Sequence, residues 1–193
     1  MNSATGKSAS CVLRGRTARL LQLALQLKGD CRALAAIEFA LIAGFLAIGA
    51  LNVADISAFL FDRTQVENAA EMGVQAAWAA CDLNHIPATT KCSGWTTTVA
   101  TAVHSTALGT SVSVASGYPT EGYYCVNSSG ALQYMSDTSS KPTDCSGAGV
   151  ASNAPGDYVK VQVTYSYSPM FSGITVAGTF PTTITETSWM RLG

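Results

Sequence analysis

Charged side chains are scarce in this chain. Asp, Glu, Lys and Arg together make up 12% of the 193 residues, whereas hydrophobic residues make up 48%. In an average soluble domain about 25% of the residues are charged. A chain of this length has room for one ordinary domain and a membrane segment, which excludes two large catalytic domains. With so few charges to keep it in water, we expect part of the chain to lie in lipid.

Residues and motifs that carry catalysis are scarce as well. The two histidines, His85 and His104, lie in polar contexts without a serine elbow or a metal-binding repeat beside them. The Gly-rich stretch 146–149 lacks the lysine and the strand-to-helix context that a phosphate-binding loop requires. We therefore predict no catalytic site, no metal and no cofactor, and we expect that the protein is not an enzyme.

The basic residues that are present are concentrated at one end. Six of the eleven Lys and Arg lie within the first 32 residues, where Asp30 is the only acid. A basic flank before an apolar segment is retained in the cytoplasm during membrane insertion. No aromatic residue is interleaved with these bases, so nucleic-acid binding is the less favoured interpretation. We predict a cytoplasmic leader over residues 1–33 and no nucleic-acid partner.

The apolar segment that follows covers residues 33–54, and Glu38 is its only ionisable side chain. A helix of this length spans a hydrocarbon core of about 30 Å. We predict a transmembrane helix over 34–54, a stem helix over 55–80 and an extracytoplasmic, β-rich domain over 81–193. A buried core helix and a secretory signal peptide are the alternatives. The first is rarely apolar on every face, and the second normally has an apolar part of only about 7 to 15 residues.

Two groups of residues flank this apolar segment in a pattern found in a known family. Glu38 and Phe39 stand near its start, and a polar and small-residue motif follows its end, with Gln65, Asn68, Ala69, Ala70 and Gly73 as its main members. Over residues 33–77 the chain resembles the TadE-like pseudopilins of tight-adherence (Flp-type) pilus systems.

The resemblance implies a minor pilin that helps the assembly, initiation or adhesion of a Tad/Flp-type pilus. A prepilin peptidase would cut between Ala33 and Leu34, where the family usually has Gly before the cut, and Glu38 would become the fifth residue of the mature chain. The new ammonium group of Leu34 in one subunit would pair with the Glu38 carboxylate of its neighbour, and the stem helix would contact other pilins or pseudopilins.

The resemblance also implies a location. The protein would cross the bacterial inner membrane once, with the N-terminus in the cytoplasm and the C-terminal domain in the periplasm, and could enter an extracellular pilus. The alternative function is an uncleaved, membrane-anchored periplasmic module that binds or senses a ligand.

The stem is expected to be helical because its small and apolar residues recur on one side. This face would pack either on the chain's own domain or on a partner, and Arg63 could pair with Glu67 one turn away. The residues assigned to the face are Ile56, Phe59, Leu60, Val66, Ala69, Ala70, Gly73, Ala76, Ala77 and Ala80.

Beyond residue 81 the composition changes to Thr, Ser, Gly and Tyr, which is typical of short strands and turns. We predict one short helix over 94–108, with Gly109 as its stop and with Trp95, Val99, Ala102 and Val103 on one face. Strands are predicted over 111–115, 123–126, 131–135, 158–167, 174–176 and 182–190. The strand over 158–167 is the clearest because Val159, Val161 and Val163 alternate with polar residues. The expected fold is α+β, with a small antiparallel sheet packed on the outer half of the long helix.

Four cysteines follow the apolar segment: Cys81, Cys92, Cys125 and Cys145. Four cysteines allow three disulfide connectivities. Their order favours pairing Cys81 with Cys92 and Cys125 with Cys145, because each bridge then closes a short loop, and export to the periplasm would let the thiols oxidise. Zinc binding is the rival interpretation, which the lack of any Cys-x-x-Cys pair disfavours.

Overall fold

The computed structural model describes residues 31–81 and 85–193, with side chains from residue 35 onward. The chain divides into two compact units, of which the first ends at Ala50 and the second comprises Leu51–Gly193. The predicted leader over residues 1–33 lies outside the described residues except for the backbone of its last three.

One long helix, α2, covers Cys31–Ala80. This stretch is rich in alanine, leucine and other good helix formers, contains no proline, and has only three glycines, at positions 44, 49 and 73. The helix is therefore uninterrupted by any strong helix breaker. The predicted long N-terminal apolar helix is confirmed.

Two short helices follow, α3 over Ala88–Lys91 and α4 over Trp95–Val103. The helix expected over 94–108 is thus shorter than predicted, although Trp95, Val99 and Val103 form its buried side as expected. Gly109 is not its stop, because the helix ends at Val103. Gly109, with φ of 54°, instead begins the 3-10 turn Gly109–Ser111.

The described residues form a five-stranded antiparallel sheet. Its strands are β1 (Val112–Val114), β2 (Thr120–Val126), β3 (Leu132–Ser136), β4 (Gly156–Ser166) and β5 (Thr183–Arg191). The long strand β4 pairs with β1, β2 and β5, and β3 pairs with β2. A long helix together with a small antiparallel sheet confirms the α+β class.

One predicted strand does not form. Residues 174–176 lie in the connection between β4 and β5 and lead into the 3-10 helix Val176–Thr179. The prediction was wrong because a short apolar run does not by itself distinguish a strand from an irregular connection. The backbone N–H of Val176 bonds to a helix side chain, Asn52, rather than to a neighbouring strand.

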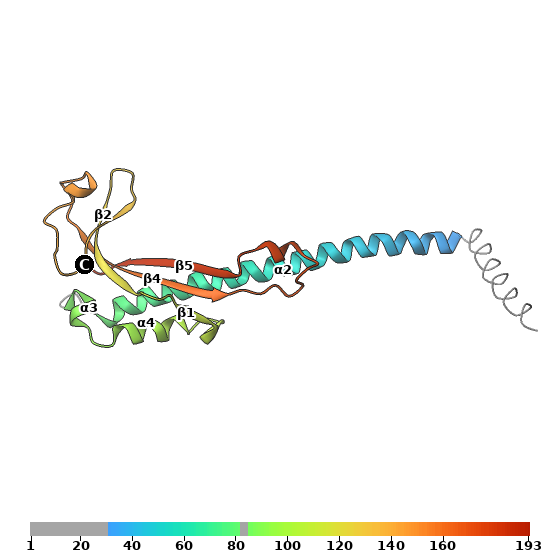
Figure 1. Ribbon diagram of the computed structural model, residues 1–193, viewed down its shortest axis with the longest axis horizontal. Helices are drawn as coiled ribbons and strands as arrows, with labels where there is room; N and C mark the ends of the chain where they lie inside the picture. Colours follow the sequence, from blue (N-terminus) through green and yellow to red (C-terminus); the bar gives the residue numbers. More distant parts are fainter. Residues whose placement is uncertain (1–30, 82–84) are drawn as a thin grey trace, which may run out of the picture. The chain divides into compact units, whose positions relative to one another are not determined.

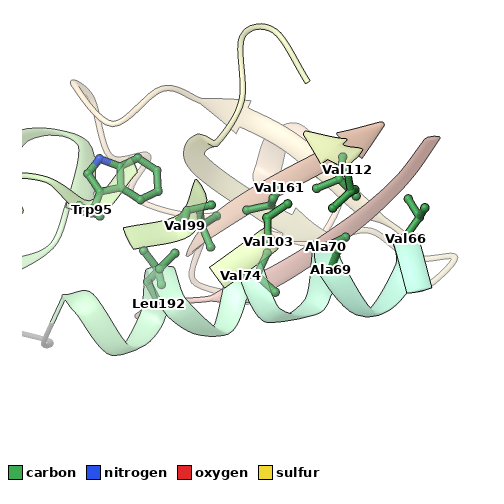
Figure 2. Close-up of a cluster of buried hydrophobic side chains, with 14 of the residues drawn as sticks. Val66, Ala69, Ala70, Val74, Trp95, Val99, Val103, Val112, Val161 and Leu192 are labelled. Carbon is green, nitrogen blue, oxygen red and sulfur yellow. The ribbon is translucent and has the colours of Figure 1, made fainter. Parts of the chain in front are cut away.

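The hydrophobic core lies between the second half of α2, helix α4 and one face of the sheet. Figure 1 shows β4, β5 and α4 running alongside this part of α2. Figure 2 shows the packing: Val66, Ala69, Ala70 and Val74 of α2 face valines from α4 and from the strands. Val159, Val161 and Val163 are fully buried, as the alternation in β4 predicts.

The stem face was assigned correctly only in part. Val66, Ala69, Ala70 and Ala77 are buried. Leu60, however, is 54% exposed and Ala80 is exposed as well. Leu60 lies on the side of the helix that the sheet leaves uncovered, so its assignment to the buried face was wrong. Ala80 lies on the same side as Gly73 at 3.6 residues per turn, but it is exposed at the last residue of α2.

Candidate functional site

The first unit presents its side chains outward. Between Ala35 and Ala50 every side chain except that of Ala43 is exposed, and Phe39 and Phe45 expose 73% and 80% of their surface. Within the described part of the chain, one helix is long and apolar enough to cross a membrane. None of its most apolar stretch is buried inside the protein, unlike the core helix of a soluble domain.

Glu38 lies on this exposed apolar stretch and is the only ionisable residue among positions 35–50. The backbone of Ala33 and Leu34, the predicted cleavage site, is already helical within α2. Their side chains lie outside the described residues. The cleavage site and the pairing role of Glu38 therefore stay predictions.

The small residues of the family-like motif pack within this chain. Ala69, Ala70 and Gly73 are buried against the chain's own sheet and helix α4. A Cβ atom on Gly73 would lie 3.0 Å from Cγ1 of Val161 and 3.1 Å from Cγ2 of Val103. The small side chains thus allow the sheet and α4 to approach the helix closely, and they are not available to a partner.

The other two motif residues, Gln65 and Asn68, are less buried than these three small residues. Gln65 is half-buried, and Asn68 is exposed on the opposite side of the helix. Asn68 lies on a surface that also carries large apolar residues: Leu60, Phe61, Met72 and Trp78, each between 42% and 58% exposed. At 3.6 residues per turn these four fall within about 120° of the helix circumference. We call these four residues the outer stem face.

Two polar residues that the sequence analysis missed lie where the apolar segment ends. The Asp55 carboxylate is fully buried and accepts hydrogen bonds from the backbone N–H groups of Met170, at 3.0 Å, and Phe171, at 3.3 Å, and from the Thr175 hydroxyl. Oδ1 of Asn52 accepts one from the N–H of Val176 at 2.8 Å. Their spacing of three residues, directly at the end of an apolar run, is the signal that could have identified them.

A ring cluster adds to this attachment. Phe59 of α2 contacts Tyr167 and Phe180, with ring centroids 5.0 and 4.8 Å apart. The hydroxyl of Tyr167 donates a hydrogen bond to the backbone carbonyl of Asp55 at 3.4 Å. Residues 167–182, which we call the β4–β5 loop, are therefore held by apolar and polar contacts to one short stretch of helix.

The predicted pair of Arg63 with Glu67 is replaced by a longer-range ion pair. Nε of Arg63 lies 2.8 Å from Oε1 of Glu186 on β5. The neighbouring Asp62 faces the same strand pair, and burial raises its pKa while a hydrogen bond from Tyr165 lowers it in part. Arg63 therefore pairs with the sheet, through Glu186, instead of with Glu67 on its own helix.

Two carboxylates meet at the far end of the sheet. Glu121 accepts hydrogen bonds from the N–H groups of Ala88 and Thr89 at 2.6 and 2.7 Å. Asp157 is 3% exposed, and neither of its carboxyl oxygens has a hydrogen-bond partner among the described residues. Burial and then the negative charge of Glu121 raise the pKa of Asp157 to about 7, and Lys141 opposes this shift.

The four cysteines that follow the apolar segment form two disulfides, Cys81 with Cys92 and Cys125 with Cys145. These are the pairs that the order of the cysteines favoured. The first joins the end of α2 to the segment after α3, and the second closes a separate small core with Ala148. In the described parts of the chain, no group of three or more His, Cys, Asp or Glu side chains is placed to hold a metal ion.

Comparison with known proteins identifies no relative. No protein-family model matches the chain, and neither a curated protein nor a solved structure matches it.

Proposed function

We propose that this chain is a minor pilin of the TadE-like type, which crosses the inner membrane once and takes part in assembling a Tad/Flp-type pilus. The observation that carries the proposal is Glu38, a single exposed carboxylate on an otherwise uncharged helical stretch. The N-terminal leader would lie in the cytoplasm and the disulfide-bonded domain in the periplasm.

A lone carboxylate in a lipid-facing helix requires a nearby cation to neutralise its charge. Placing an acid within the hydrocarbon region costs on the order of 2.5 to 3.5 kcal/mol, and such residues usually pair with another group. Among positions 35–50 this chain offers Glu38 no cation of its own. Cleavage between Ala33 and Leu34 by a prepilin peptidase would create an ammonium group, which in a neighbouring subunit could neutralise Glu38 and set the register of packing.

The outer stem face supports the same role. The sheet packs on one side of the stem, so the small residues of the motif are used within the chain. Leu60, Phe61, Met72 and Trp78 remain exposed on the other side. In a filament of packed stems, these large side chains rather than Ala69, Ala70 and Gly73 would contact neighbouring pilins.

N-terminal sequencing of the protein recovered from membranes tests the processing step. A mature chain that begins at Leu34 is the expected result. A chain that still begins at Met1 would contradict the proposal and favour the alternative, an uncleaved anchored module that binds or senses a ligand in the periplasm.

The pairing role is tested by Glu38→Gln, with Glu67→Gln as a matched control. Both changes remove one exposed carboxylate from α2, but only the first lies in the apolar stretch. We expect Glu38→Gln to insert normally and to recover several-fold less of the other pilins on co-purification, while the control recovers the wild-type amount. Equal recovery from both variants would remove the assembly role of Glu38.

A further inference from the structure

The β4–β5 loop exposes large apolar side chains that no function proposed above uses. Met170, Ile174 and Val176 expose 63%, 60% and 54% of their surface. They lie close together along the chain, around Gly173, whose φ of 86° belongs to the left-handed region and turns the backbone at this point. The loop therefore presents three large apolar side chains outside the core.

The loop also lacks charge. Between Lys160 and Glu186 the sequence contains no Asp, Glu, Lys or Arg. An exposed connection in a soluble domain normally carries such residues, since they keep it solvated. Because the loop carries no ionised side chain of its own, its apolar side chains can enter the edge of a lipid layer without the cost of desolvating a charge.

The loop is attached at one defined level of the helix. Its backbone N–H groups at Met170, Phe171 and Val176 donate to the side chains of Asp55 and Asn52. The apolar segment of the helix ends at Ala54. The hydrogen bonds therefore hold the loop at the position along the chain where a membrane-spanning helix would leave the hydrocarbon.

These bonds also reduce the cost of placing the loop in an apolar environment. The loop contacts the carboxylate of Asp55, which is buried and accepts hydrogen bonds from two N–H groups and the Thr175 hydroxyl. A buried charge with satisfied hydrogen bonds is far less costly than a bare one.

From these observations we propose that the β4–β5 loop is a second membrane contact. Met170, Ile174 and Val176 insert into the interfacial region of the leaflet through which the helix exits, and Asn52 and Asp55 hold the loop there. The domain is then restrained at two places on the lipid surface, by its helix and by this loop. The proposal requires that the helix spans a membrane, but it does not depend on a role in a pilus.

Depth-dependent fluorescence quenching of the full chain tests the proposal. Cys11→Ser and Cys31→Ser first remove the thiols outside the two disulfides. Ile174→Cys is then labelled with an environment-sensitive nitrobenzoxadiazole dye, and the protein is placed as one copy per nanodisc of phosphatidylethanolamine and phosphatidylglycerol. Nitroxide lipids labelled near the headgroup serve as the quencher.

Two labelled controls make the result specific. Ala151→Cys places the dye on an exposed turn elsewhere in the domain, and Phe45→Cys places it within the apolar stretch of the helix. We expect the dye at position 174 to emit at shorter wavelength and to be quenched several-fold more than the dye at 151. The dye at 45 is expected to respond best to nitroxides placed deeper in the acyl chains.

Two outcomes would overturn the proposal. If position 174 behaves like 151 while position 45 is quenched, the helix spans the bilayer but the loop does not touch it. If position 174 becomes shielded only when two copies share a nanodisc, and shallow nitroxides still fail to quench it, the loop binds a second copy of the chain rather than lipid.

Discussion

The two halves of α2 have the same backbone conformation but opposite surroundings. Residues 35–50 expose apolar side chains on every side, whereas the half beyond Asp55 buries one face against a sheet and exposes the other. Both halves are rich in alanine and contain glycine. Helix propensity is therefore common to both halves. The contacts that each half makes depend instead on how its large side chains are distributed around the helix.

The difference in packing between the two halves is clearest at two glycines of α2, Gly44 and Gly73. At Gly44, apart from the adjacent residues and the local helix backbone, nothing lies within 4 Å of the place where a Cβ would be, whereas at Gly73 the valine methyl groups of β4 and α4 lie at 3.0 and 3.1 Å. The same residue type is therefore dispensable for packing within the chain at the first position and required at the second.

The largest expected effect comes from a matched pair of substitutions at these glycines. Gly73→Val should destabilise the domain by about 3 kcal/mol, because overpacking a core displaces neighbouring side chains. Gly44→Val should leave the stability of the domain unchanged. Unfolding of the full chain in detergent by urea, followed by near-ultraviolet circular dichroism, measures both. Equal effects at the two positions would show that the packing of the two halves does not differ in this way.

The two acids of the helix give the next comparison. Asp55→Ala should cost about 2 kcal/mol, since the N–H groups of Met170 and Phe171 would lose their acceptor inside the protein. Glu38→Ala, which removes an exposed carboxylate, should not change the unfolding midpoint. The same urea titration applies, and Asp55→Asn, which keeps one acceptor oxygen, should lose less than Asp55→Ala. An unchanged midpoint for Asp55→Ala would argue against the anchoring of the β4–β5 loop.

The stability of the second unit should also depend on pH through Asp157. Its pKa is raised from 3.8 to about 7 in the folded state, so the folded chain binds this proton more tightly than the unfolded chain does. Stability is therefore highest below about pH 4 with respect to this group, falls as pH rises to about 7, and is constant above that. A shift of one pKa unit corresponds to about 1.4 kcal/mol of stability. Because solvent around the partly exposed Glu121 screens its charge, we expect the free energy of unfolding to fall by only about 2 kcal/mol between pH 4 and 7.

Asp157→Asn isolates this contribution. The variant should lose the decline in stability between pH 4 and 7, and should be more stable than the parent at neutral pH. Urea unfolding at several pH values compares the two proteins. A parent whose stability rises through this window, with no difference from the variant, would show that Asp157 ionises normally.

The smallest expected effect is at the ion pair between Arg63 and Glu186. The Arg63 side chain is 56% exposed, so the pair is largely screened by water. Arg63→Ala should lower the free energy of unfolding by only about 0.5 kcal/mol or less, and added salt should abolish the difference. A loss as large as that for Asp55→Ala would mean that the arginine stem, rather than its charge, supports the sheet.

Local patterns predicted the elements whose cause is local. The alternation of Val159, Val161 and Val163 identified β4 and its buried face, and the apolar spacing of Trp95, Val99 and Val103 identified the buried side of α4. The run 174–176 has the same composition as a strand but forms none, because its backbone bonds to the helix. Composition alone cannot distinguish these two cases.

Residues whose role depends on distant partners could not be identified in this way. Asp55 looks like an ordinary polar residue after an apolar run, yet it is fully buried because a loop more than a hundred residues later supplies its hydrogen-bond donors. Arg63 pairs with Glu186 instead of Glu67 for the same reason.

By itself, the sequence determined the long apolar helix, its lone Glu38, the alternating strand β4 and the α+β class, because each follows from composition and from periodicity along a continuous segment. Only the tertiary structure decided which face of the stem is covered, why Gly73 must be small, and where the β4–β5 loop is held. Those features depend on side chains that are far apart in the chain and become neighbours only when the sheet packs on the helix.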